Sequence, residues 1–114
     1  MAAVKPQKVP SLKQKIRWLL EDLQAYQPEK VILFGSAARG DADEQSDLDV
    51  VLIKQTPVGF VQRGVDAVIL LRAGVLPVDL FVYTPEEFAR MKESENPFIE
   101  SVLRDGKVLY EKAA

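Results

Sequence analysis

Three short apolar runs constrain the fold of this chain most strongly. They cover residues 31–34, 48–53 and 78–83, and helical patterns or polar loops separate them. Apolar runs of this length, rich in β-branched side chains and bounded by glycine, proline or polar residues, are typical of buried strands. Strands that alternate with helices predict an α/β (α+β) fold, a small mixed β-sheet with helices packed on it.

The first helix is expected between Ser11 and about Tyr26. Ser11 and Gln14 have the spacing of a capping box, in which each side chain caps a backbone N–H group at the start of the helix. Pro28 then ends the helix, because proline does not continue it. The apolar residues between these limits recur at helical spacing: Leu12, Ile16, Leu19, Leu20 and Leu23.

A second helical pattern begins at Pro57, and Gly74 is expected to cap its C-terminal end. Its apolar residues fall on one face of the helix: Val61, Val65, Val68 and Leu71. Two more helix starts follow the third strand. Thr84 to Glu87 supply a cap, a proline at the first position and an acid at the third. Asn96-Pro97 starts a short helix that Gly106 ends, and residues 107–110 are expected to form an edge strand.

The length of 114 residues fits one domain. Residues 1–10 contain two prolines and are expected to be a flexible N-terminal arm, so the domain itself would cover residues 11–114. No apolar run approaches the length that spans a bilayer, and the N-terminus has no apolar signal-peptide core. We therefore expect a cytoplasmic protein.

The absence of two residue types narrows the possible chemistry. The chain has no cysteine and no histidine, which excludes disulfides, thiolate sites, the usual zinc sites and histidine general bases. Its formal net charge of -2 gives no electrostatic case for wrapping nucleic acid. Any reaction must therefore depend on carboxylates, hydroxyls, lysines, arginines and the backbone.

Three aspartates could supply such chemistry. Asp47 and Asp49 are two residues apart at the start of the second strand, so their carboxylates point to one face. Asp79 lies in the third strand and points away from its apolar neighbours, so it can join them if the two strands pair. Three converging carboxylates repel one another, and a hard cation such as Mg²⁺ or Mn²⁺ would supply the missing positive charge. Two such ions could clamp the oxygens of an in-line displacement.

A phosphate-binding turn is expected directly after the first strand. Gly35 lets the backbone approach a phosphate, and the Ser36 hydroxyl and the following N–H groups can donate to it. Arg39 could add a charge-assisted contact. The segment 35–40 begins like a P-loop, but Asp41 stands where that motif needs a lysine.

Gly35-Ser36, ten intervening residues and then Asp47-x-Asp49 resemble the G-S-x(10)-D-x-D motif of the DNA polymerase beta-like nucleotidyltransferases. The short chain and the Val78-Asp79-Leu80 strand are similar to the minimal, MNT-type branch. The resemblance implies a polymerase beta palm-like fold and implies that Gly35 and Ser36 hold the triphosphate. Arg39 and Ser46 are further candidates for nucleotide binding. The resemblance also implies that Asp47, Asp49 and Asp79 ligate two Mg²⁺ ions, and that Asp79 helps to activate the attacking hydroxyl.

Members of this branch are often encoded beside a helical HEPN-type protein. The resemblance implies a toxin–antitoxin pair in which this chain is the antitoxin and transfers AMP from ATP to a hydroxyl of the HEPN toxin.

Several alternatives remain open at this point. The chain could be a non-catalytic binding module that masks a partner protein, or it could transfer to a small molecule. Asp79 could be a buried ion-pair partner of an arginine such as Arg72. Arg39 could be an ordinary surface residue, and Asp41, Asp43 and Glu44 are expected to form a solvated acidic loop.

Overall fold

A computed structural model describes residues 10–43 and 46–113 of the chain. The arm expected over residues 1–10 lies outside the described residues except for Pro10, and so does Glu44 of the acidic loop. In the described ranges, no helix has both the length and the apolar character needed to cross a membrane.

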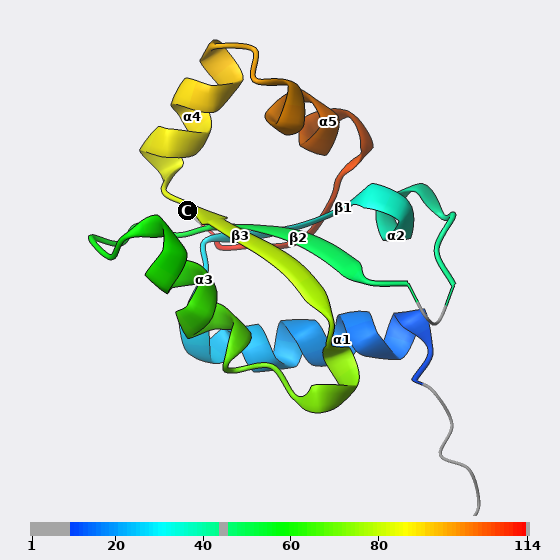
Figure 1. Cartoon of the computed structure of the whole chain (residues 1–114). Helices are drawn as coiled ribbons and strands as arrows, with labels where there is room; N and C mark the ends of the chain where they lie inside the picture. Colours follow the sequence, from blue (N-terminus) through cyan, green and yellow to red (C-terminus); the bar gives the residue numbers. More distant parts are fainter. Residues whose placement is uncertain (1–9, 44–45, 114) are drawn as a thin grey trace, which may run out of the picture.

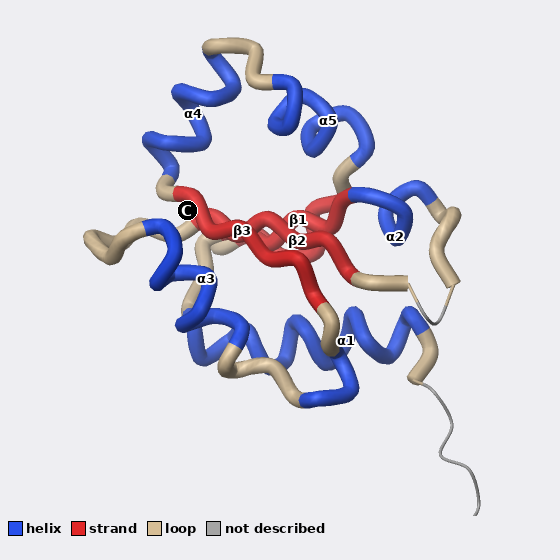
Figure 2. The backbone as a smooth tube through the Cα atoms, viewed as in Figure 1, coloured by secondary structure: helices blue, strands red, loops and turns tan. Residues whose placement is uncertain are grey.

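One four-stranded sheet lies between two layers of helices (Figures 1 and 2). The strand order is β3-β2-β1-β4; β2 and β3 are parallel, and β1 is antiparallel to β2 and to β4. Helices α1 and α3 cover one face, α4 and α5 cover the other, and the short α2 follows β1 (Figure 1). The bounds are α1 Leu12–Leu23, β1 Lys30–Phe34, α2 Gly35–Arg39, β2 Leu48–Ile53, α3 Phe60–Val68, β3 Val78–Tyr83, α4 Pro85–Glu93, α5 Pro97–Asp105 and β4 Lys107–Glu111. The predicted α/β fold with a small mixed sheet is confirmed.

Local sequence signals explain most of these bounds. The Ser11 side chain accepts the Gln14 backbone N–H at 3.1 Å at the start of α1, and a 3-10 turn carries the chain on to Tyr26. Thr84 and Glu87 form the complete capping box of α4. Asn96 caps α5 and Gly106 ends it, and β4 is an edge strand, as predicted.

The prediction for the second helix was wrong at both ends. Helix α3 begins at Phe60 rather than Pro57 and ends at Val68. Its end tightens because the N–H groups of residues 70 and 71 bond to carbonyls only three residues earlier. Gly74 therefore caps no α-helix; it lies in a 3-10 turn, where an added Cβ would come within 2.8 Å of the Trp18 ring.

The strands bury apolar side chains on both faces of the sheet. Leu48, Val50 and Leu52 of β2 pack toward α1, where Leu19 and Leu23 are fully buried. Val51 and Ile53 pack on the opposite face, toward α5. This two-sided burial explains why β2 is almost continuously apolar, and it makes Asp49 an exception that needs a reason.

A buried arginine joins α3, β3 and α4. Arg63 donates to the Val58 carbonyl at 2.6 Å, to the Val82 carbonyl at 3.3 Å and to the Glu87 carboxylate at 2.6 Å. Glu87 also accepts the Thr84 N–H, so the capping box and the ion pair share one carboxylate. The position of α4 over the sheet therefore depends on this network.

The network predicts a specific loss of stability in acid. The Arg63 guanidinium and the Thr84 N–H hold the pKa of Glu87 below its ordinary value. The stabilisation is therefore present above the ordinary glutamate pKa and is lost as the pH falls. At neutral pH, Glu87→Gln should lower the free energy of unfolding by about 1 to 2 kcal/mol. Urea melts should show this difference shrinking as the pH falls below the ordinary glutamate pKa; a difference independent of pH would contradict the assignment.

Candidate active site

Two aspartates face each other across the parallel strands. The register of β2 and β3 places Asp49 directly opposite Asp79. Neighbouring strands lie about 4.8 Å apart, and side chains at paired positions project to the same face. Two of the three aspartates singled out in the sequence are therefore brought together, on the face that α4 and α5 cover farther along the strands.

The Asp49 carboxyl carries the electrostatic signature of this contact. Burial raises its pKa most, followed by a hydrogen bond to the Asp79 side chain, the charge of Asp79 and the charge of Asp47; Arg39 lowers it. The positive charge of Arg39 therefore offsets only part of the negative charge around this half-buried carboxyl. Such perturbed carboxyls are typical of functional sites.

Three aromatic rings form a cluster on the face of the sheet to which Asp49 projects. Phe34 pairs with Asp49 across β1 and β2, and Phe81 lies two residues after Asp79 on the same face. Phe98 of α5 packs edge-on against both rings, with centroids 5.3 Å and 5.4 Å away. This cluster was not predicted from the sequence. Side chains alternate between the two faces along β1 and β3, and this alternation places Phe34 and Phe81 on the same face as the aspartates.

Gly35 completes the site from the end of β1. Its φ of +70° lies in the left-handed region that favours glycine. A Cβ at this position would overlap Oδ2 of Asp49 and would lie 3.2 Å from its Cγ. The glycine is therefore needed both for the turn and for the space that the Asp49 carboxylate occupies.

Asp47 is less closely engaged than the other two aspartates. It is exposed, lies just before β2 and reaches Asp49 through its charge. Among residues 10–43 and 46–113, no group of three or more acidic side chains stands in an arrangement ready to hold a metal ion. The donor set nevertheless fits a hard cation, since its ligands would be carboxylate oxygens and Arg39 offsets only part of the negative charge around Asp49.

The other residues predicted to contact the nucleotide lie nearby, and two of them bond to aspartates close to them in the sequence. Ser36 is half-buried in the first turn of α2. Arg39 is exposed and pairs with Asp41 at 3.2 Å. The Ser46 hydroxyl donates to the Asp43 carboxylate at 3.2 Å and accepts the Asp43 N–H at 3.1 Å, which closes the loop before β2.

The alternative role of Asp79, as a buried partner of Arg72, is wrong. Asp79 is exposed. Arg72 instead pairs with Asp22 at 2.7 Å and with Glu21 at 2.9 Å, both on α1. Asp79 therefore lies in β3 without the structural ion pair that would have explained it.

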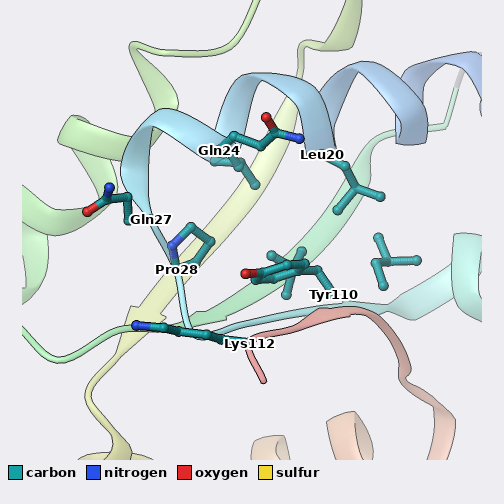
Figure 3. A pocket seen from close by; sticks show the side chains of 9 residues that line it. Leu20, Gln24, Gln27, Pro28, Tyr110 and Lys112 are labelled. Atoms are coloured by element: carbon teal, nitrogen blue, oxygen red, sulfur yellow. The ribbon is translucent and has the colours of Figure 1, made fainter. Parts of the chain in front are cut away.

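A cavity of about 660 Å³ lies elsewhere, between α1 and β4 (Figure 3). Leu20, Pro28 and Tyr110 contribute to its walls, and Gln24 and Lys112 also line it. It is at the opposite end of β1 from Gly35 and on the other face of the sheet, and the residues that line it include no carboxylate. It is therefore separate from the aspartates.

Comparison with known proteins identifies the class to which this fold and site belong. The family model described as "Nucleotidyltransferase domain" matches residues 16–110, most of the chain. The protein thus belongs to the nucleotidyltransferase family and is an enzyme of that class.

Two relatives from Methanocaldococcus jannaschii are each named "Putative protein adenylyltransferase". One is 37% identical over 82 residues, which cover 72% of this chain and 78% of the relative. The other is 46% identical over 50 residues, which cover 43% of this chain and 46% of the relative. A crystal structure titled as a "putative nucleotidyltransferase" from Sulfolobus solfataricus matches with a TM-score of 0.57. It is 23% identical, and the match covers 88% of this chain and 79% of that chain, so it shows a shared fold.

Two glycine variants distinguish the cost of the left-handed backbone from the effect on the candidate active site. Gly35→Ala must place a Cβ on the Asp49 carboxylate, whereas Gly40→Ala meets nothing within 4 Å, although its φ of +84° is equally left-handed. Both should lose about 1 kcal/mol for the backbone conformation. Only Gly35→Ala should lose more and also weaken nucleotide binding. Equal urea midpoints and equal nucleotide affinities for the two variants would contradict the role given to Gly35.

The aspartate pair predicts a variant that gains stability in metal-free buffer. Because the pKa of Asp49 is raised, its ionisation costs stability as the pH rises above the ordinary aspartate value. Asp79→Asn removes the charge opposite Asp49, so at neutral pH it should unfold at equal or higher urea, by about 0.5 to 2 kcal/mol. The gain should vanish in acid, where Asp49 is protonated. A loss of several kcal/mol in EDTA would show instead that Asp79 is structural.

Proposed function

We propose that this chain transfers AMP from ATP to a hydroxyl group of a partner protein, in a reaction that needs Mg²⁺ or Mn²⁺. The observation that carries the proposal is the pairing of Asp49 with Asp79 beside Gly35, which gathers negative charge that Arg39 offsets only in part. The names of the M. jannaschii relatives support a protein as the acceptor.

Asp47, Asp49 and Asp79 are the residues that would hold the metal ions. When bound, two ions would neutralise the triphosphate and stabilise the attacking and leaving oxygens. The raised pKa of Asp49 fits this role, since a carboxyl whose charged form is disfavoured gains from a nearby cation.

Gly35 and Ser36 would hold the triphosphate. The left-handed turn at Gly35 leaves room for close approach, and Ser36 with the following N–H groups can donate to phosphate oxygens. Arg39 and Ser46 would have to exchange their present partners in the loop for the nucleotide. Nucleotide binding would therefore change the contacts of Arg39 and Ser46.

The transfer is an in-line displacement at the α-phosphorus of ATP. The acceptor oxygen forms a bond to this phosphorus while the bond to the oxygen that bridges the α- and β-phosphates breaks. Pyrophosphate leaves with that electron pair, and the acceptor proton passes to Asp79, which helps to activate the hydroxyl. Asp79 suits this step because it is exposed and borders Asp49.

The proposed acceptor is a HEPN-type helical protein, with this chain as the antitoxin of a toxin–antitoxin pair. The similarity of residues 35–49 and 78–80 to the minimal branch of the family supports this partner. The reaction would attach AMP covalently to the toxin.

A labelling experiment tests the reaction. With ATP labelled on the α-phosphate and Mg²⁺, the chain should label a purified HEPN-type protein encoded beside it, and EDTA should abolish the labelling. Asp49→Asn should lower the rate at least about 100-fold, because one ligand charge is lost. Label from γ-labelled ATP, or transfer undiminished in EDTA, would contradict the proposed reaction.

A further inference from the structure

The cavity between α1 and β4 lies apart from the candidate active site, and its size fits a small molecule (Figure 3). Its volume of about 660 Å³ falls within the range of about 300 to 1,000 Å³ that is usual for small-molecule sites. The end of α1 and the turn after it form one wall, and the end of β4 forms the wall across from them (Figure 3). The cavity is therefore a concave surface that a small molecule can occupy.

Apolar side chains cover most of the inner surface of this cavity. Leu23 and Val31 line it and are each only 1% exposed, and Pro28 beside them is buried. Nearer to solvent, Tyr110 lines the cavity with its large side chain 45% exposed. An apolar group that entered the cavity would cover the Tyr110 ring and would itself leave water, and both changes favour binding.

Four polar side chains line the same cavity: Gln24, Gln27, Tyr110 and Lys112. Within residues 10–43 and 46–113, these four side chains make no hydrogen bond or ion pair with the rest of the protein. Their functional groups are two amides, a phenol and an ammonium, and all of them can donate a hydrogen bond. A few polar groups without protein partners, set among apolar walls, are typical of a site that orients a ligand.

The charge of the cavity favours an anionic ligand. Among the described residues that line it, Lys112 carries the single formal charge. The acidic residues that neighbour the lining in sequence have other partners. Glu29 accepts the Gln55 backbone N–H at 3.2 Å, and Glu111 lies 4.0 Å from the Lys30 ammonium. A carboxylate in the cavity would therefore meet a lysine and neutral donors, and hydrogen bonds from a charged donor are stronger than neutral ones.

A group with one negative charge fits this cavity better than a phosphate. A phosphate carries up to two negative charges, whereas the lining supplies one cation. The cavity also lies beside the C-terminal end of α1, where the helix dipole is negative and disfavours a highly charged anion. The triphosphate of a nucleotide is poorly matched for the same reasons.

We propose that the cavity between α1 and β4 binds a small carboxylate that has an apolar body. The carboxylate would accept hydrogen bonds from Lys112 and from the nearby glutamine amides, and the apolar body would lie between Leu20 and Tyr110. The three aspartates take no part in this site. The inference therefore stands independently of the proposed transfer of AMP.

Two probes that differ in one functional group test this inference. Phenylacetate has an apolar ring and a carboxylate, and phenylethanol has the same ring with a neutral hydroxyl. Each is titrated into the isotope-labelled full chain at constant pH and salt, while nuclear magnetic resonance follows the side-chain signals of Leu20, Leu23 and Val31. The titrations are repeated with Lys112→Gln, which removes the cation at an exposed position. Lys107→Gln is the matched control, since Lys107 is an exposed lysine of β4 that does not line the cavity.

We expect phenylacetate to shift these signals saturably, with a Kd of about 1 mM or tighter, which is the scale for a ligand of about ten non-hydrogen atoms. Phenylethanol should bind roughly fivefold more weakly, because it lacks the charge-assisted hydrogen bond. Lys112→Gln should abolish this difference, and Lys107→Gln should retain it. Equal affinity of the two probes for the wild type would overturn the preference for a carboxylate. Shifts that do not saturate, or that occur at Gly35 and Asp49 while the cavity signals stay unchanged, would overturn the site itself.

Discussion

The in-register pairing of Asp49 with Asp79 is the constraint to which the rest of the site is fitted. Parallel strands β2 and β3 place these carboxyls side by side, and the antiparallel β1 ends beside them at Gly35. The glycine leaves the space that the Asp49 carboxylate fills. The crossover through α3 makes the parallel pairing possible, and Arg63 ties that helix to the end of β3 and to α4. The helices thus hold two like charges together.

One face of the sheet contributes mainly to stability, and the other face contains the candidate active site. The face toward α1 contains the larger apolar cluster, with Leu19, Leu48 and Val82 fully buried. The other face begins as an apolar layer against α5 and ends at Asp49 and Asp79, with aromatic rings between. Burial raises the pKa of Asp49, and the hydrogen bond to Asp79 and the charges of Asp79 and Asp47 add to the effect. The charge arrangement of the site therefore lowers the stability of the fold, and the burial of apolar side chains in the main core offsets this loss.

The sequence predicted the strands well because they are short, apolar and clearly bounded; β2 and β3 match their predicted limits. The capping box of α4 was equally clear. The ends of the second helix were mistaken because its apolar spacing continues to Leu71, whereas the backbone tightens into turns after Val68. The pairing of buried Arg63 with Glu87 is equally hidden, because the two residues are distant in sequence. Arg72 was offered as a partner of Asp79 because nothing local reveals its pairing with Asp22, fifty residues away. The meeting of Asp49 with Asp79 could be predicted only on the condition that their strands pair, and the aromatic cluster beside them depends on the packing of α5.

The central proposal is that Asp49 and Asp79, beside Gly35, would hold the cation. Nuclear magnetic resonance of the isotope-labelled protein during titration with Mn²⁺ tests it most directly, since this paramagnetic ion broadens the signals of nearby nuclei. Backbone signals of Gly35, Asp49 and Asp79 should broaden first, and excess Mg²⁺ should restore them. Loss of these signals should not occur in Asp49→Asn at the same Mn²⁺ concentration. Broadening that begins at other acidic residues, such as Glu93 or Glu100, and leaves Asp49 and Asp79 unchanged would contradict the account.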